Sequence, residues 1–254
     1  MKVFQSKGFL AVIGIIVGIA VFIIAFVSAA EIAFYSDYGF YEKEFQKYNV
    51  NHKESIINMK MDELMMVLKE SMLYLRGDRE NLDIQAEIDG EMKEYYNDID
   101  KSHMKDVQYL FLEGLEKRML SIGIVVVAMV LLVLTNGAKR AVMTVCAGIQ
   151  WFFLFMLGVV AMIAAFAVID FNKAFTIMHL LLFDNDNWLL DPSISRLINM
   201  FPEEFFMDMG IRWGTIFIFV IFFIFVLCFL AKRGMIKVDA KNAIKLSGGT
   251  YEQG

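Results

Sequence analysis

The residues of this sequence best suited to chemistry are its three histidines, because histidine exchanges protons near neutral pH. The unperturbed pKa of an imidazole is about 6.5, so one ring can take a proton and later return it. His103 has a carboxylate, Asp106, three positions later, and His179 interrupts an otherwise apolar run. His52 lies in a polar stretch and is expected to be an ordinary surface residue. His103 and His179 are therefore the candidates for acid–base catalysis.

Each of these two histidines also has a plainer interpretation. Residues at positions i and i+3 of a helix are neighbours, so Asp106 could hold the His103 ring in one tautomer and make its other nitrogen a better base. Helix surfaces also produce such pairs by chance. An ionisable group such as His179 is expensive at a membrane boundary unless it is used or paired, but it could also reach the headgroups as an interfacial side chain. The pattern alone leaves both interpretations open.

Other kinds of catalytic site fit the sequence less well. Asp184, Asp186 and Asp191 could suggest calcium, but their spacing lacks the glycine and distal glutamate of a calcium loop, so turn formation is favoured. Two histidines and a carboxylate could suggest zinc, but there is no HExxH or comparable close pair. There is no GxSxG motif, and Ser102 points about 100° away from His103 on a helix. A serine acyl-enzyme is disfavoured, and direct acyl transfer with histidine as proton shuttle remains open.

The composition indicates a polytopic membrane protein rather than a soluble domain. Hydrophobic residues make up 58% of the 254 residues, aromatic residues make up 14%, and only two prolines are present. The mean hydropathy is +0.54. A net charge of -5 without a basic groove argues against a nucleic-acid partner. Cys146 and Cys228 lie in apolar segments, where a small buried side chain is expected rather than a disulfide or a metal site.

The first apolar run extends from Phe9 to Ala30 and follows Lys2 and Lys7. A run of about 20 residues is long enough to cross the hydrocarbon core of a membrane. The small residues of Val27–Ala30 would also suit a signal peptidase. The run is longer than the usual core of a signal peptide, so an uncleaved transmembrane helix is favoured.

Three further apolar spans are predicted at Met119–Thr135, Ala141–Ile169 and Trp213–Leu230. Basic residues flank the N-terminus, the turn at 136–140 and the region after Leu230, so the positive-inside rule predicts that both termini are cytoplasmic. The predicted fold class is an all-α polytopic membrane protein with four transmembrane helices and a mainly helical extracytoplasmic domain between the first two. The predicted organisation begins with a cytoplasmic N-terminus and first transmembrane helix at 1–30, followed by an extracytoplasmic domain carrying His103 at 31–118. Two transmembrane helices with a short cytoplasmic turn follow at 119–169, and an extracytoplasmic loop carrying His179 follows at 170–212. The chain ends with a fourth transmembrane helix at 213–231 and a cytoplasmic tail at 232–254.

Two helices are expected within the acidic segment 31–118. One extends from Asp62 to Arg76, with four apolar residues at helical spacing, and ends before Gly77, but its pattern does not say whether it packs on its own domain or on lipid. The other begins between Asp98 and Ser102 and carries His103. If this helix continued unbroken to Met119, it would hold the imidazole about 24 Å from the apolar span. That distance is too large for His179, so we expect the span to begin near Leu110 or the helix to bend near Gly114.

Several stretches resemble one family, the bacterial lipoprotein intramolecular transacylases. Ser102-His103-Met104-Lys105-Asp106-Val107 resembles its first histidine motif. The second histidine motif of the family resembles a stretch that begins with Met178-His179-Leu180, continues with Asn187-Trp188-Leu189-Leu190-Asp191-Pro192 and ends with Phe201-Pro202-Glu203. Leu73-Tyr74-Leu75-Arg76-Gly77 is a weaker landmark. The likeness extends over nearly the whole chain, and it departs from the expected pattern at Gln108, where a lysine is expected.

The resemblance implies an activity. Such enzymes move the sn-2 acyl chain of a lipoprotein's diacylglyceryl group to the α-amino group of its N-terminal cysteine, which gives the lyso form. It also implies that diacylated lipoprotein and membrane lipid are the partners, that the protein works in the plasma membrane of a Gram-positive bacterium, and that no cofactor is needed. The oligomeric state stays open, with a monomer favoured. The alternative is a non-catalytic membrane scaffold whose acidic outer domain binds a partner protein. The implied catalytic residues are His103 and His179, and the implied orienting or supporting residues are Asp106, Tyr74, Arg76, Asn187, Trp188 and Asp191.

The implied reaction suits the two histidines. An α-amino group has a pKa near 7.7 to 8.0 and must lose a proton before it attacks an ester. A general base typically contributes about 10²- to 10⁴-fold, and holding the amine and the ester of one molecule together lowers the barrier further. His179 is the preferred base, because apolar surroundings keep it neutral. His103, beside Asp106, would more readily hold a positive charge and serve as acid or oxyanion partner.

Overall fold

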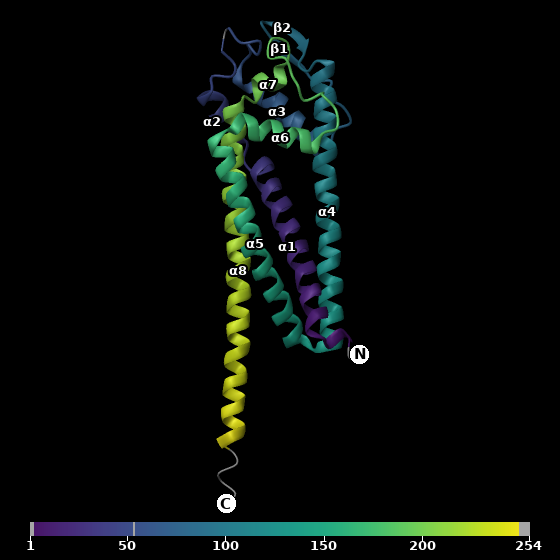
Figure 1. Ribbon diagram of the computed structural model, residues 1–254. Coiled ribbons are helices and arrows are strands. Elements are labelled where there is room, and N and C mark those ends of the chain that lie inside the picture. The colour runs from purple at the N-terminus through teal and green to yellow at the C-terminus, as the bar shows by residue number, and fades with distance from the viewer. Residues whose placement is uncertain (1–2, 53, 249–254) are drawn as a thin grey trace, which may run out of the picture. The chain divides into compact units, whose positions relative to one another are not determined.

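The computed structural model of the chain describes residues 3–52 and 54–248, with side chains up to Val238. Lys2 and the last residues of the predicted cytoplasmic tail lie outside this part. The chain divides into two compact units, here called unit 1 (Met1–Ser28, Lys117–Ala161 and Phe217–Gly254) and unit 2 (Ala29–Glu116 and Met162–Ile216). The elements labelled in Figure 1 are η1 (Val3–Gln5), α1 (Lys7–Tyr35), α2 (Tyr38–Lys47), α3 (Met61–Arg76), β1 (Gln85–Ile88), β2 (Glu91–Glu94), α4 (Asp98–Asn136), α5 (Ala138–Ile169), α6 (Phe171–Leu182), α7 (Arg196–Met200) and α8 (Glu203–Gly248).

Four helices in the described part of the chain are long and apolar enough to cross a membrane. They are α1, α4, α5 and α8, and the apolar spans predicted from the sequence lie within them. Each helix continues past its apolar run into polar sequence, because an α-helix satisfies its backbone hydrogen bonds equally well in water and in lipid. The predicted class of a mainly helical membrane protein with four transmembrane helices is confirmed.

In unit 1, α1 and α5 approach each other at glycines. A Cβ atom added at Gly148 would lie 2.0 Å from the carbonyl oxygen of Gly14, and one added at Gly18 would lie 2.8 Å from the carbonyl oxygen of Gly148. Membrane helices commonly use small residues in this way, because van der Waals contact between backbones replaces the hydrophobic effect as the driving force. Cys146 and Cys228 are free and buried, as predicted.

Unit 2 has its own hydrophobic core, and α3 belongs to it. The apolar positions predicted for this helix, among them Leu64, Leu68 and Leu75, are all buried. This answers the question that the amphipathic pattern left open: α3 packs on its own domain. The helix ends at Gly77, whose φ of +81° is the left-handed conformation that glycine adopts most easily, as expected from the sequence. Other large members of the core are Tyr41, Phe45, Ile57, Ile88, Tyr95, Met200 and Phe205.

A short β-hairpin in unit 2 was not anticipated from the sequence. β1 and β2 pair antiparallel, with Ile88 opposite Glu91, and the two residues between them are Asp89 and Gly90. Both turn residues have positive φ, +56° and +78°, which is the requirement of the tight turn that Asp-Gly favours. Ile88 is fully buried, so the hairpin adds one apolar face to the core of the unit.

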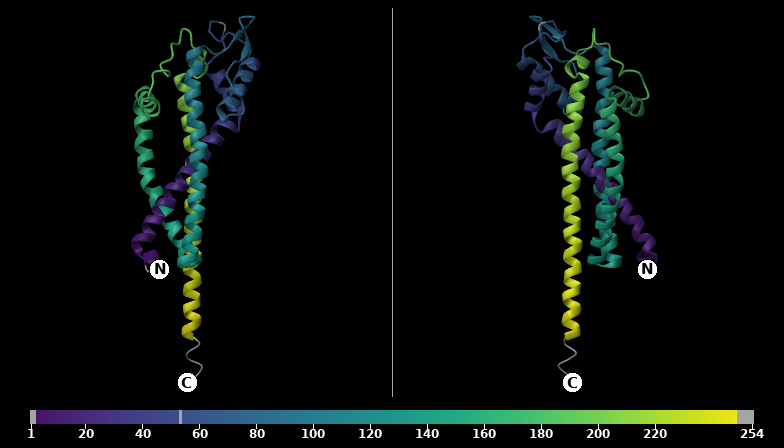
Figure 2. Two further views of the ribbon diagram at one scale, coloured as in Figure 1. Left: turned by 90° about the vertical axis from the view of Figure 1, so that its right-hand side faces the viewer. Right: turned by 60° about the vertical axis from the view of Figure 1, so that its left-hand side comes forward.

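The position of His103 on α4 corrects a sequence-based expectation. α4 is a single helix of 39 residues, Asp98–Asn136, and therefore includes Gly114. Figure 2 shows it as one unbroken helix. We expected such a helix to carry His103 beyond the reach of His179. The expectation was wrong because the segments that carry the two histidines, the start of α4 and α6, belong to the same compact unit. His179 lies on α6.

Candidate active site

The structure brings the two candidate histidines together in unit 2. His103 lies on the second turn of α4 and His179 on the last turn of α6. Their ring centroids are 6.0 Å apart, and the ring planes are inclined by 35°. Both side chains are buried, with exposed fractions of 8% for His103 and 6% for His179. Two titratable groups that are far apart in the sequence thus share one enclosed position.

Aromatic side chains surround the pair. Phe175 and Phe183 are four residues before and after His179, and their ring centroids lie 4.2 and 5.7 Å from its ring. Phe183 also meets the His103 ring at 5.3 Å. Trp188 stacks on His179 with ring centroids 5.0 Å apart and planes inclined by 29°. These rings exclude water, and the resulting burial lowers the pKa of His179 below its ordinary value, so that the ring is neutral at neutral pH.

The tautomer of His179 follows from its hydrogen bond to the backbone. Its Nδ1 atom lies 2.8 Å from the carbonyl oxygen of Phe175, one helical turn earlier. A carbonyl oxygen only accepts hydrogen bonds, so Nδ1 must carry the proton and Nε2 must carry the free lone pair. The Nε2 atom of His179 is therefore available as a base.

Asp106 does not hold the His103 ring, and this corrects the expected pairing. Its Oδ2 atom instead accepts hydrogen bonds from Asn185 at 3.0 Å and Asn187 at 3.3 Å. The Nδ1 atom of His103 is buried and has no hydrogen-bond partner among the described residues. Two amide donors from the loop thus bind one oxygen of the carboxylate. Burial, helped by the neighbouring His179, lowers the pKa of His103 to about 4 although Asp106 acts to raise it, so the expectation of a positively charged His103 is wrong. Asp106 positions the loop that carries Trp188.

The loop after α6 is held by turn hydrogen bonds. Asn187 donates its backbone N–H to the Asn185 side chain at 2.9 Å. The carboxylate of Asp191 accepts hydrogen bonds from the backbone and the hydroxyl of Ser193, at 2.8 and 2.7 Å, and these bonds lower the pKa of Asp191. Asp191 therefore has the turn role favoured by the sequence. Within residues 3–52 and 54–248, no three His, Cys, Asp or Glu side chains are arranged to hold a metal ion.

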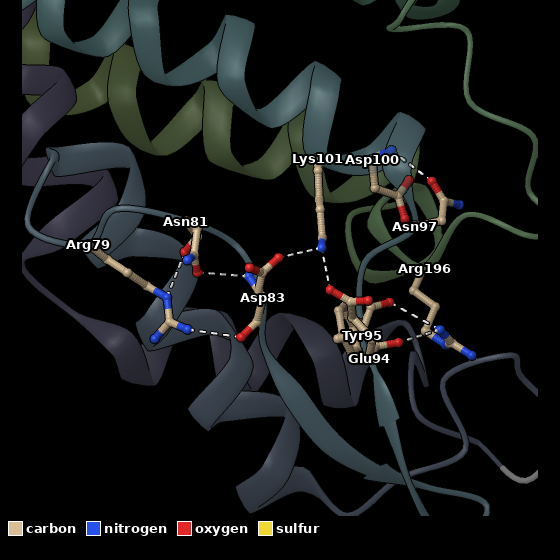
Figure 3. A network of polar contacts seen from close by, with 9 residues as sticks. All are labelled: Arg79, Asn81, Asp83, Glu94, Tyr95, Asn97, Asp100, Lys101 and Arg196. Carbon is tan, nitrogen blue, oxygen red and sulfur yellow. Dashed lines mark hydrogen bonds and ion pairs between the residues drawn. The ribbon is translucent and has the colours of Figure 1, made fainter.

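A polar network joins the start of α4 to the rest of unit 2 (Figure 3). Lys101 donates to Asp83 at 2.5 Å and also contacts the carboxylate of Glu94 on β2. Arg196, at the start of α7, donates to the backbone carbonyl groups of Glu94 and Tyr95 at 3.2 and 3.1 Å. The contacts of Lys101 and Arg196 hold the start of α4, the hairpin and the start of α7 together, and Lys101 precedes His103 by two residues.

Asp100 connects α4 directly to α7. Its side chain is fully buried and accepts a hydrogen bond of 2.5 Å from the hydroxyl of Ser195. The same hydroxyl accepts a hydrogen bond from the backbone N–H of Ile198 at 3.3 Å and so caps the N-terminus of α7. Since Asp100 precedes His103 by three residues, this contact holds the turn of α4 that carries the catalytic candidate.

The landmark around Tyr74 and Arg76 supports the fold rather than the ring pair. Tyr74 is buried, and its carbonyl oxygen accepts a hydrogen bond from the side-chain amide of Gln108. Gln108 therefore supplies a donor at the position where a lysine was expected. Arg76 pairs with Glu31 at 3.9 Å and with Asp78 at 3.8 Å, and none of the contacts described for it involves His103 or His179.

His52, the third histidine, is exposed as predicted and takes no part in the site. Its Nδ1 atom lies 2.8 Å from the carbonyl oxygen of Asn49. Sequence reasoning identified both central histidines but overlooked Phe175, Phe183 and Asn185. The spacing of four residues on either side of His179 would have placed both phenylalanines on its helix face. No local signal would have linked Asn185 to Asp106.

Comparisons with known proteins identify the family of the chain and its fold. A family model described as "Lipoprotein intramolecular transacylase Lit" matches residues 15–206. The solved structure of the membrane integral lipoprotein intramolecular transacylase Lit from Bacillus cereus is 22% identical, covers 93% of this chain and 100% of its own, and superposes with a TM-score of 0.66. A histidine-to-alanine variant of that protein is 20% identical, with coverages of 95% and 100% and a TM-score of 0.66.

The two kinds of match carry different weight. Identities near 20% show a shared fold. A search of the curated proteins found no match. The family model, in contrast, covers well over half of the chain. The chain therefore belongs to the Lit family of lipoprotein intramolecular transacylases.

Proposed function

We propose that this membrane protein moves the sn-2 acyl chain of a diacylglyceryl-cysteine to the α-amino group of the same cysteine. The observation that carries the proposal is the pair of buried histidines, one of which has a free Nε2 lone pair fixed by its backbone hydrogen bond. Membership of the transacylase family supplies the class of reaction. The products are the lyso-form lipoprotein and a free glycerol hydroxyl on the same molecule.

The two rings divide the proton transfers. The amine nitrogen attacks the ester carbonyl carbon while Nε2 of His179 takes a proton from that nitrogen. The bond between the carbonyl carbon and the sn-2 oxygen then breaks. The departing oxygen takes a ring N–H proton from His103 while the other ring nitrogen of His103 takes the proton that His179 gained. His103 therefore stays neutral, both rings end uncharged, and a change of tautomer in His103 restores the enzyme. The transfer exchanges an ester for an amide within one molecule and requires no metal or other cofactor.

The other face of α6 suits a lipid substrate. The side chains of Leu180, Leu181 and Leu182 are 62%, 80% and 47% exposed. The side chain of His179, which immediately precedes them, is buried. A helix that is apolar outward and carries a polar group inward is typical of the membrane interface. Lying there, α6 would hold His179 near the depth at which the ester groups of a lipid are found.

We propose the topology predicted from the basic residues, with both termini cytoplasmic and the active site on the extracytoplasmic face. Lys7, Lys139, Arg140 and Lys232 lie near the corresponding ends of the spans. The segments 31–118 and 170–212 would then lie outside, and both contribute to the histidine pair. A cysteine placed at Asn49 or Asp186 should react with an impermeant reagent in intact cells. Reaction only after lysis would contradict this orientation.

Mass spectrometry of N-terminal lipopeptides tests the activity directly. The protein is expressed in a host that otherwise makes diacyl lipoproteins. The expected result is an acylated amine and a free glycerol hydroxyl with no change in total acyl mass, because the transfer is internal. An unchanged diacylglyceryl fragment pattern would contradict the transfer and favour a partner-binding scaffold.

A further inference from the structure

Two buried polar atoms in the site have no hydrogen-bond partner among the described residues. They are Nδ1 of His103 and the indole Nε1 of Trp188. Both rings lie close to His179, with centroids at 6.0 and 5.0 Å. A buried donor left unpaired destabilises the folded state, so each such atom needs an explanation. Two unpartnered polar atoms lie on rings beside His179, the proposed base, and this indicates that their hydrogen-bond partner is a polar group of the substrate.

The stacking geometry determines where the Trp188 donor points. An indole N–H lies in the plane of its own ring, and the His179 ring lies roughly parallel to that plane, inclined by 29°. The N–H is therefore directed along the edge of the stack and not into the face of His179. Indole is a donor without an acceptor or a titratable proton, so it cannot act as base. It can only donate a hydrogen bond to an oxygen next to His179.

The indole is also held in place before any substrate arrives. The neighbouring Asn187 donates to Asp106 on α4 at 3.3 Å, and Asn185 donates to the same oxygen at 3.0 Å. The carbonyl oxygen of Trp188 accepts a hydrogen bond from the backbone N–H of Leu190 at 3.0 Å. A fixed donor stabilises developing charge more than a mobile one, because no reorganisation is required during the reaction.

We propose that Trp188 is a further catalytic residue whose indole N–H donates a hydrogen bond to the ester carbonyl oxygen of the substrate. This inference rests on the proposed acyl transfer. When the amine nitrogen bonds to the carbonyl carbon, the carbonyl oxygen takes up negative charge and the hydrogen bond from Nε1 becomes stronger. The charge returns to the carbon–oxygen bond as the bond to the sn-2 oxygen breaks. The indole proton stays on Nε1 throughout.

Replacing Trp188 by benzothienylalanine tests the donor, because this amino acid keeps the size and stacking of indole but has sulfur in place of N–H. The full chain is purified and assayed with a synthetic diacylated lipopeptide. We expect kcat to fall about 10²-fold, as for removal of one oxyanion donor, with KM little changed. The same replacement at Trp151, which is 74% exposed on α5, should leave kcat unchanged.

A second replacement separates donation from packing. Fluorinated tryptophan at position 188 makes the N–H a stronger donor and weakens the stacking of the ring while it leaves the ring shape nearly unchanged, so it should retain kcat or raise it. The inference is wrong if the benzothienylalanine variant keeps full kcat, if its loss lies entirely in KM, or if the fluorinated variant loses as much. Failure of the unmodified protein to convert the lipopeptide would instead contradict the proposed function itself.

Discussion

In unit 1 the helices meet through glycine and phenylalanine, whereas in unit 2 hydrogen bonds between polar side chains join the elements in addition to a hydrophobic core. Gly14 and Gly148 bring two backbones into contact, and the edge of Phe22 meets Phe217 with ring centroids 5.2 Å apart. Contacts of that kind depend on shape. The contact between Asp106 and its two asparagine donors depends on matched donors and acceptors. Unit 1 should therefore be sensitive to added volume, and unit 2 to the loss of single polar atoms.

The active site differs from the rest of unit 2 because two unpartnered polar atoms belong to rings that both lie against one histidine. Elsewhere in the unit, the Ser195 hydroxyl donates to one carboxylate oxygen of Asp100, and single buried atoms such as the other oxygen of Asp100 and the Tyr95 hydroxyl have no hydrogen-bond partner among the described residues. At the site, His103 and Trp188 keep buried atoms without partners. Polar groups that cost stability in the free protein can be retained when they bind the substrate or its transition state. Amino-acid substitutions can distinguish polar groups that bind the substrate, polar groups that stabilise unit 2, and the apolar packing of unit 1.

The largest effect is expected from the two histidines. His103→Ala and His179→Ala should each reduce conversion of a diacylated lipopeptide by at least about 10²-fold, and the double variant should be scarcely worse than either, because the rings act as a unit. His52→Ala is the control, since His52 is exposed and lies outside the site. Near-normal conversion by either single variant, while folded, would contradict the paired mechanism.

Gly148→Ala tests the packing of unit 1. The added Cβ would lie 2.0 Å from the Gly14 carbonyl oxygen, so α1 and α5 must separate. We expect a loss of about 1 to 3 kcal/mol in the free energy of unfolding, which thermal denaturation in detergent would measure as a lower Tm. Gly158→Ala on the same helix is the matched control, because nothing lies within 4 Å of its added Cβ. Equal Tm values for the two variants would argue against the close crossing.

Asp106→Ala tests the contact that positions the loop. It removes the acceptor of Asn185 and Asn187, and the loop with Trp188 should become less well placed. We expect kcat to fall about 10-fold, less than for the histidines, because a positioning contact is lost and no reacting group is removed. The exposed neighbour Lys105→Ala should have no effect on kcat. If Asp106 instead fixed the tautomer of His103, Asp106→Ala would lower kcat as much as His103→Ala.

The smallest effect concerns the protonation of His179. Burial disfavours its charged form, so the ring should become half protonated only below its ordinary pKa of about 6.5. As the pH is lowered, His179 should therefore remain unprotonated and active as a base at pH 6.5, and its activity as a base should be lost only at lower pH. Nitrogen-15 NMR of labelled protein would measure the titration and should show a proton on Nδ1 in the neutral ring. Half protonation at or above pH 6.5, or a proton on Nε2, would contradict the assignment.

Local patterns in the sequence were enough for several elements. The four apolar runs predict the membrane helices because crossing lipid requires length and hydropathy, which are local properties. The end of α3 follows from Gly77, whose missing side chain permits positive φ. The same reasoning applied to Asp89-Gly90 would have predicted the hairpin, since this pair is a strong signal for a two-residue turn.

The sequence by itself determined the two histidines as the groups able to exchange protons, because that ability belongs to the imidazole ring. Only the tertiary structure decided what each ring contacts. Asp106 has a histidine three residues away on its own helix, yet it accepts hydrogen bonds from Asn185 and Asn187 on a distant loop. The aromatic enclosure of His179 and the unpaired indole N–H of Trp188 likewise depend on how α4, α6 and the loop pack. Hydrogen-bond partners and burial are set by distances in space, which local spacing along the chain does not contain.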